Sequence, residues 1–94
     1  MDEKLLPFLD NQHRVLRWPK KKDDKYLVLK YLQSKFDSTV KYSEIEVNRI
    51  LMKWNTFNDH ALLRREMYNN YLLNRTNDCK EYWVNNDCSN MEIL

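Results

Sequence analysis

The stretch from Ser43 to Trp54 constrains the fold of this chain more than any other part of the sequence. It reads SEIEVNRILMKW and opens with a capping box. In that motif the Ser43 hydroxyl accepts from the backbone N–H of Glu46, while the Glu46 carboxylate accepts from the N–H of Ser43. Apolar residues then recur at the spacing of one helix face: Val47, Ile50, Leu51 and Trp54. The sequence therefore predicts a helix with a defined start and one buried side.

A second helix is predicted immediately downstream, from Asp59 to Asn70, with Asn58 or Asp59 as its N-cap. Only a short polar turn separates the two helices. A helical wheel places Leu63 and Met67 on the inner side. The outer side carries one small residue, two guanidinium groups and one amphipathic ring: Ala61, Arg64, Arg65 and Tyr68.

The flanking segments complete a recognisable order of elements. Two short strands, 72–76 and 81–84, are separated by the turn residues 77–80 and predict a hairpin. Upstream, an apolar stripe that begins behind Asp23 and Asp24 and reaches Phe36 predicts the first helix, and 40–42 is extended enough for a short strand. Residues 5–9 fit a short helix or an extended lead-in, and 11–19 a small strand over the core.

This order predicts an α+β, mainly α, fold: a winged helix-turn-helix with a three-helix core and a C-terminal β-hairpin wing. We expect residues 1–22 to be an N-terminal lead-in and basic linker, 23–84 the winged-helix domain, and 85–94 a C-terminal tail. The chain of 94 residues has room for one hydrophobic core.

The chain contains no glycine, which affects every turn that requires a positive φ. Asn and Asp are the usual substitutes, because their short polar side chains tolerate the left-handed region. We therefore expect the second helix of the helix-turn-helix to end in that conformation at Asn69 or Asn70.

The net charge of +2 does not by itself indicate a nucleic-acid partner. The charge is unevenly distributed, however, with +4 over residues 1–41 and −2 over 42–94. No apolar run is long enough for a membrane helix and no signal peptide is evident, so we expect a cytoplasmic protein with no membrane association. In that compartment Cys79 and Cys88 would remain thiols.

In a winged helix-turn-helix, the helix from Asp59 to Asn70 is the element that enters the DNA major groove, and the wing lies against backbone phosphate. The candidate DNA-binding residues are Ala61, Arg64, Arg65, Tyr68, Arg75 and Lys80, with auxiliary phosphate contacts from Arg14, Arg17, Lys20, Lys21 and Lys22. Each set has a structural alternative. The helix arginines fit a solvated face or an ion pair with Glu66 or a neighbouring helix, and the upstream basic cluster fits a solvated linker.

Enzymatic and metal chemistry have little support in the sequence. His60 beside Asp59 is explained by a helix N-terminus, and no nucleophile lies at a telling spacing. Cys79, Cys88, His13 and His60 contain no CxxC or HxxxH pair. We expect no catalytic site, no metal and no cofactor.

Six blocks of sequence resemble a known bacterial family, the domain of unknown function family 2087. They are FLD (8–10), RVLRWPKK (14–21), YLVLKYLQSKF (26–36), YSEIEVNRIL (42–51), HALLRREM (60–67) and LLNRTNDCKEYW (72–83). The resemblance implies a small winged-helix domain, found alone or fused to ArsR-like or MerR-like regulators, with a presumed role in transcription. The family often has glycine where this chain has Tyr71 and Cys79, so Asn70 or Asp78 is expected to carry the positive φ.

The leading hypothesis is a DNA-binding transcriptional regulator. It uses helix 59–70 as recognition helix and hairpin 72–84 as wing, with duplex DNA as partner and a possible homodimer or regulatory protein partner. The alternative is a non-enzymatic protein-interaction module built on the same fold. Steeply salt-dependent binding to duplex DNA would distinguish the two.

Overall fold

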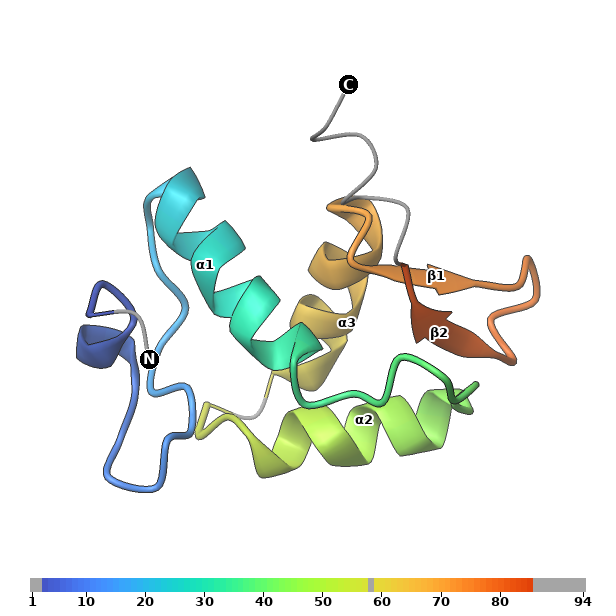
Figure 1. Ribbon diagram of the computed structural model, residues 1–94, viewed down its shortest axis with the longest axis horizontal. Helices are drawn as coiled ribbons and strands as arrows, with labels where there is room; N and C mark the ends of the chain where they lie inside the picture. The colour runs from blue at the N-terminus through green and yellow to red at the C-terminus, as the bar shows by residue number, and fades with distance from the viewer. Residues whose placement is uncertain (1–2, 58, 86–94) are drawn as a thin grey trace.

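The computed structural model describes residues 3–57 and 59–85 of the 94-residue chain. The order of elements is a short 3-10 helix η1 (Leu6–Phe8), three α-helices, α1 (Lys22–Gln33), α2 (Glu44–Lys53) and α3 (His60–Asn69), and two strands, β1 (Leu73–Arg75) and β2 (Tyr82–Val84) (Figure 1). This is the predicted winged-helix layout. None of the helices in the described ranges is long and apolar enough to cross a bilayer. The predicted tail falls outside these ranges from residue 86 onward.

The start of α2 confirms the capping box. The N–H of Glu46 donates to Ser43 Oγ at 3.1 Å, and the N–H of Ser43 donates to Glu46 Oε1 at 2.9 Å. Behind this cap Val47 and Leu51 are fully buried, while Ile50 and Trp54 pack at the margin of the core. The predicted inner face is thus the face that contacts the rest of the molecule.

Helix α1 ends at Gln33, three residues before the predicted end at Phe36. The amides of Lys35 and Phe36 bond to carbonyls three residues back, Leu32 and Gln33, so the chain tightens into successive turns. Phe36 nevertheless remains buried, with its ring edge-on to Tyr42 at 5.3 Å between centroids. The apolar spacing identified a core residue correctly but extended the helix too far.

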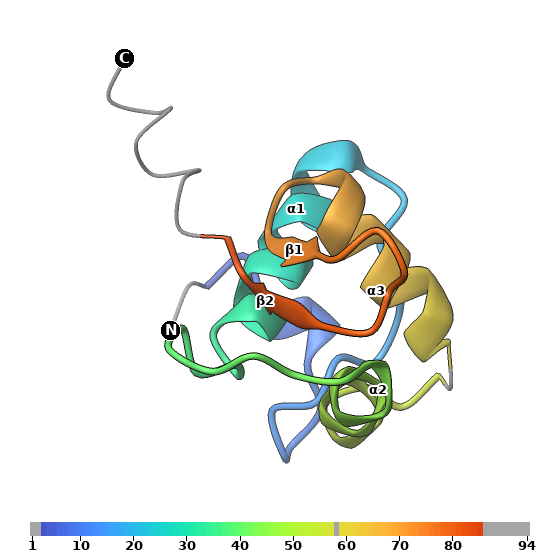
Figure 2. The same ribbon diagram turned by 90° about the vertical axis from the view of Figure 1, so that its right-hand side faces the viewer.

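The hairpin pairs Leu73 with Val84 and Arg75 with Tyr82 in antiparallel register. Tyr42 lies beside this hairpin and exchanges two backbone hydrogen bonds with Tyr82, both 2.7 Å. The expected strand at 40–42 is therefore present as an isolated bridge. Viewed from the wing side, the hairpin lies in front of α1 and α3, with α2 end-on below it (Figure 2).

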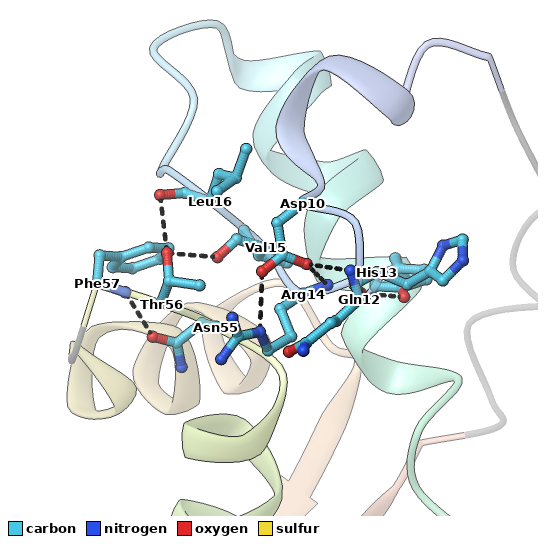
Figure 3. A network of polar contacts seen from close by, with 10 residues as sticks. Asp10, Gln12, His13, Arg14, Val15, Leu16, Asn55, Thr56 and Phe57 are labelled. Atoms are coloured by element: carbon cyan, nitrogen blue, oxygen red, sulfur yellow. Dashed lines mark hydrogen bonds and ion pairs between the residues drawn. The ribbon is translucent and has the colours of Figure 1, made fainter.

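The N-terminal residues form a second, smaller hairpin that the sequence did not predict. Leu9 bridges Val15, and the amide of Leu16 donates to the carbonyl of Phe8 at 2.7 Å. The Asp10 carboxylate holds the turn, because it accepts from the amides of Gln12 and Arg14 and from Arg14 Nε at 2.9 Å (Figure 3).

This N-terminal hairpin docks on the turn between α2 and α3. The amide of Val15 donates to the carbonyl of Trp54 at 2.7 Å, and the amide of Thr56 donates to the carbonyl of Val15 at 2.9 Å. The Thr56 hydroxyl also reaches the carbonyls of Val15 and Leu16 (Figure 3). The same core cluster contains Leu5, Leu9 and Val15 together with the apolar residues of α1, α2 and α3. The segment predicted as a lead-in therefore packs as part of the folded unit, and the division at residue 22 stays a prediction.

Positive φ angles occur at His13, Tyr71 and Cys79, each at 62°, and not at Asn69, Asn70 or Asp78. The expectation from residue type was therefore wrong. At the end of α3 the reason is register. The amide of Leu72 donates to the carbonyl of Met67 at 2.9 Å, and the amide of Tyr71 donates to the carbonyl of Tyr68 at 3.1 Å. These two bonds are the Schellman pattern. That pattern requires the left-handed conformation one residue after the C-cap Asn70, at Tyr71.

Candidate nucleic-acid interface

Helix α3 has a buried inner side and an accessible outer side, as the helical wheel predicted. Leu63 and Met67 are fully buried, whereas Ala61 and Arg65 are exposed. The Asp59 carboxylate caps the helix by accepting from the amide of Leu62 at 3.3 Å. The cap fixes where the helix begins, and the buried residues fix which side of the helix faces outward.

Arg64 is turned toward α2. Its Nη2 lies 3.0 Å from Glu44 Oε1, its Nη1 donates to Asn48 Oδ1, and its side chain is 19% exposed. The structural alternative of an ion pair with a neighbouring helix thus holds for this residue. Arg64 thus links α3 to α2 through Glu44 and Asn48.

The wing contributes a third guanidinium to the same surface. Arg75 Cζ lies 4.2 Å from the centroid of the Tyr68 ring, a cation–π contact between β1 and α3. Its Nη1 also donates to Cys79 Sγ at 2.9 Å and to the carbonyl of Thr76 at 3.3 Å. Arg75 is therefore held against the helix instead of pointing away from the wing.

An open hollow of about 300 Å³ lies where α3 meets the wing. It is lined by Arg64, Arg65, Tyr68, Asn69, Arg75, Cys79 and Tyr82. Four of the six predicted DNA-binding residues therefore come together, while Ala61 and Lys80 do not line it. Tyr82 also lines the hollow, and burial raises the pKa of its phenol, with Cys79 adding to the effect.

The predicted auxiliary cations lie elsewhere. Arg14 pairs with Asp10 at 2.9 Å, and the Arg17 guanidinium lies 5.3 Å from the Phe8 ring centroid. Lys20 and Lys22 line a different hollow, whose α3 residues are Glu66 and Asn70. Since Glu66 lies two residues after Arg64, it is rotated about 200° around the helix. The structure thus separates this basic cluster from the surface that carries Arg65 and Arg75.

The candidates for catalysis or metal binding do not gather. His60 is the first residue of α3, directly after its cap, and His13 lies in the N-terminal turn. Within residues 3–57 and 59–85, no three His, Cys, Asp or Glu side chains lie close enough to hold a metal ion. Cys88 lies outside the described residues.

Sequence reasoning missed two features of this surface. One is the identity of the Arg64 partner: an ion pair with a neighbouring helix was among the alternatives, but Glu44 lies 20 positions away and has no local signature. The other is the N-terminal hairpin that braces the turn before α3. An alternation of apolar residues around a turn, Leu9 and Val15 on either side of Asp10 to His13, was its only available signal.

The fold and the surface define a small winged-helix domain. Three guanidinium groups line the hollow between α3, the second helix of the helix-turn-helix, and the wing. The profile of a family described as "Uncharacterized protein conserved in bacteria (DUF2087)" matches residues 14–84, and the chain belongs to this family. The predicted resemblance is thereby confirmed. No curated protein and no solved structure matches the chain.

Proposed function

We propose that this protein is a DNA-binding transcriptional regulator of the bacterial cytoplasm, with α3 in the major groove and the wing against the phosphate backbone. The supporting observation is the convergence of Arg64, Arg65 and Arg75 on one hollow beside the exposed face of α3. No catalytic step is part of the proposal.

The chemistry of these groups suits a duplex. A guanidinium bonds bidentately to guanine or to phosphate, and phosphate contacts set the register in which base contacts are made. Because Arg65 is exposed, its guanidinium is the group available to contact a base edge or a phosphate. Arg75 lies over Tyr68 and fits a phosphate contact from the wing.

Arg64 has a different part in this proposal. Its ion pair with Glu44 and its bond to Asn48 hold α3 against α2. Removing Arg64 would therefore disturb the geometry of the helix-turn-helix as well as its charge. Arg65 and Arg75 are the informative positions for testing DNA contact.

One α3 helix reads a short site, so useful affinity requires two copies on two half-sites or a fused or bound DNA-binding partner. A homodimer, or a regulatory protein partner, is accordingly part of the proposal. Light scattering with and without DNA measures which assembly is bound.

The test is binding to a pool of randomised 20-base-pair duplexes and to one fixed duplex across a salt series. We expect log affinity to fall linearly with log salt, with a slope near −0.9 for each phosphate contacted. Arg65→Ala and Arg75→Ala should each weaken binding about tenfold or more, which corresponds to one lost bidentate contact. Lys30→Ala, which removes one charge from α1, is the matched control and should change affinity little. Salt-independent binding that survives both arginine substitutions would rule the proposal out.

A second candidate function is a protein-interaction module, favoured by one observation on α2. Ile45 and Met52 are 63% and 53% exposed and lie seven residues apart, hence on one side of the helix. Ile45→Ser combined with Met52→Ser should leave DNA affinity unchanged if the DNA proposal is correct. If the module is correct, this double variant loses partner binding while Arg65→Ala retains it.

A further inference from the structure

A second basic surface surrounds Trp18, where the chain runs from the N-terminal hairpin into α1. Five cations lie between Arg17 and Lys25, and Trp18 is half-buried among them. Hollows of about 310 and 340 Å³ adjoin the Trp18 side chain, and both are also lined by Lys20. From the sequence, Lys20 and Lys22 were expected either to contact phosphate or to lie in a solvated linker. The structure puts ring and cations side by side.

The larger hollow combines aromatic, cationic and acceptor groups. Lys20, Lys22 and Lys25 contribute three ammonium groups, and Trp18 and Tyr26 contribute rings. The Nζ of Lys25 lies 5.7 Å from the Trp18 ring centroid, so charge and ring are presented together. Its volume lies at the lower end of the range of small-ligand pockets, roughly 300–1,000 Å³.

One side of this hollow belongs to α3. Glu66 and Asn70 line it, and Asn70 is held by a 2.8 Å bond from its Nδ2 to the carbonyl of Glu66. The Glu66 carboxylate is an acceptor among three donors. Glu66 is rotated about 200° from Arg64 around the helix and about 100° from Arg65. The residues that line this hollow and those that line the hollow beside the wing do not overlap.

We propose that the hollow at Trp18 binds a nucleoside phosphate as a small-molecule ligand. Lys20, Lys22 and Lys25 hold the phosphate, because ammonium-to-phosphate hydrogen bonds are strengthened by charge on both partners. The base stacks on Trp18 or Tyr26, since every base offers a π-face to an aromatic ring. Glu66 accepts from an amino or hydroxyl group of the ligand. The ligand thereby contacts α3 without occupying the face that carries Arg65.

The experiment is an NMR titration of the ¹⁵N-labelled full chain with adenosine monophosphate, inorganic phosphate and adenosine in turn. The three tryptophan side chains report separately, and only Trp18 lines the hollow. We expect saturable shifts of the Trp18 indole N–H and of the α1 amides near Lys22 and Lys25, with the Trp54 and Trp83 indoles unmoved. Adenosine monophosphate should bind more tightly than either phosphate or adenosine alone.

Two charge-matched triple variants complete the test. Replacing Lys20, Lys22 and Lys25 by Gln should weaken adenosine monophosphate binding by about tenfold or more. Replacing Lys35, Lys41 and Lys53 by Gln removes the same charge elsewhere and should leave binding within about twofold of the parent chain. Each variant's amide spectrum shows that it is folded before titration.

Several outcomes would overturn the proposal: no saturable shift at Trp18, equal weakening by both triple variants, or inorganic phosphate binding as tightly as the nucleotide. The same holds if single-stranded oligonucleotides shift Trp18 while adenosine monophosphate does not, because the surface would then belong to a nucleic acid. Since DNA is absent from these titrations, their result is independent of the proposed regulatory function.

Discussion

Two short hairpins flank the helices, and their turns are built alike. In the N-terminal hairpin the amide of His13 bonds to the carbonyl of Asp10, and in the wing the amide of Cys79 bonds to that of Thr76, both at 3.0 Å. The residue that closes each turn has φ of 62°. Each turn also contains an aspartate whose carboxylate accepts backbone amides, Asp10 in one and Asp78 in the other.

Their surroundings differ. Val15 of the N-terminal hairpin is completely buried. Its N–H and its carbonyl both form hydrogen bonds with the turn between α2 and α3. The wing leaves its tip exposed and places Arg75 over Tyr68 beside the outer face of α3. Similar turn chemistry thus shapes both hairpins, and tertiary contact gives the first a bracing role and the second an accessible surface.

The two hairpins should differ most in how much a shortened side chain lowers the free energy of unfolding. Val15→Ala removes two buried methyl groups and leaves a cavity, so we expect the free energy of unfolding to fall by about 2–3 kcal/mol. Lys80→Ala at the exposed wing tip should change it by less than about 0.5 kcal/mol. Urea denaturation followed by circular dichroism measures both. A loss below about 1 kcal/mol for Val15→Ala would show that the hairpin does not brace the core.

The positive-φ positions offer a stabilising test in both hairpins and at the end of α3. Tyr71→Gly should raise the free energy of unfolding by about 1 kcal/mol, because relief of the left-handed strain exceeds the added entropy of the unfolded chain. His13→Gly should do the same to a smaller extent, and Cys79→Gly least, since it loses the Sγ contact with Arg75. Asn69→Gly, at the last residue of α3, is the control and should destabilise. If Tyr71→Gly lowers the free energy of unfolding, relief of left-handed strain at that residue is not the larger effect.

The paired aspartates predict how acid affects each hairpin. Hydrogen bonds from the Arg14 amide lower the pKa of Asp10, and the Thr76 hydroxyl lowers that of Asp78, both from 3.8. Because the folded pKa is depressed, this stability is present above the unfolded value and is lost as pH falls through the folded one. Carboxyl ¹³C shifts measure each pKa directly. Asp10→Asn and Asp78→Asn should each flatten the acid limb of stability, and an unchanged limb would contradict the corresponding contact.

The smallest expected effect is at alkaline pH in the wing. Burial raises the pKa of Tyr82 above 10.0, so the folded state keeps its proton while the unfolded chain releases it. Stability is therefore fully present below pH 10 and declines as pH rises toward the folded pKa. Absorbance at 295 nm should show one tyrosine ionising later than the others, and Tyr82→Phe should remove that late step. A late step that persists in Tyr82→Phe belongs to another tyrosine.

The predictions that succeeded rest on local rules. The capping box at Ser43, the spacing of Leu63 and Met67 and the turn residues 77–80 between two short strands each act within a few residues, so the sequence alone specifies them. These features were sufficient to place α2, α3 and the wing.

The predictions that failed depended on contacts between distant segments or on register. The position of the left-handed residue after α3 is set by the need to bury Leu72 beside Met67, not by which residue prefers that conformation. The partner of Arg64 is supplied by a helix whose packing angle no local pattern encodes. The sequence thus named four residues that line one hollow, but it did not indicate which of their charges are already engaged.

The bonds from Val15 to Thr56 also have a consequence for the order of folding. They close a loop of 41 residues, whereas α2, α3 and the wing are neighbours along the chain. Loop closure costs entropy before the contact is made, and distant contacts slow folding. We therefore expect the helices and wing to assemble first and the amides of Val15 and Thr56 to gain protection from hydrogen exchange last. The helix-turn-helix would thus reach its final rigidity only when the start of the chain folds back over it.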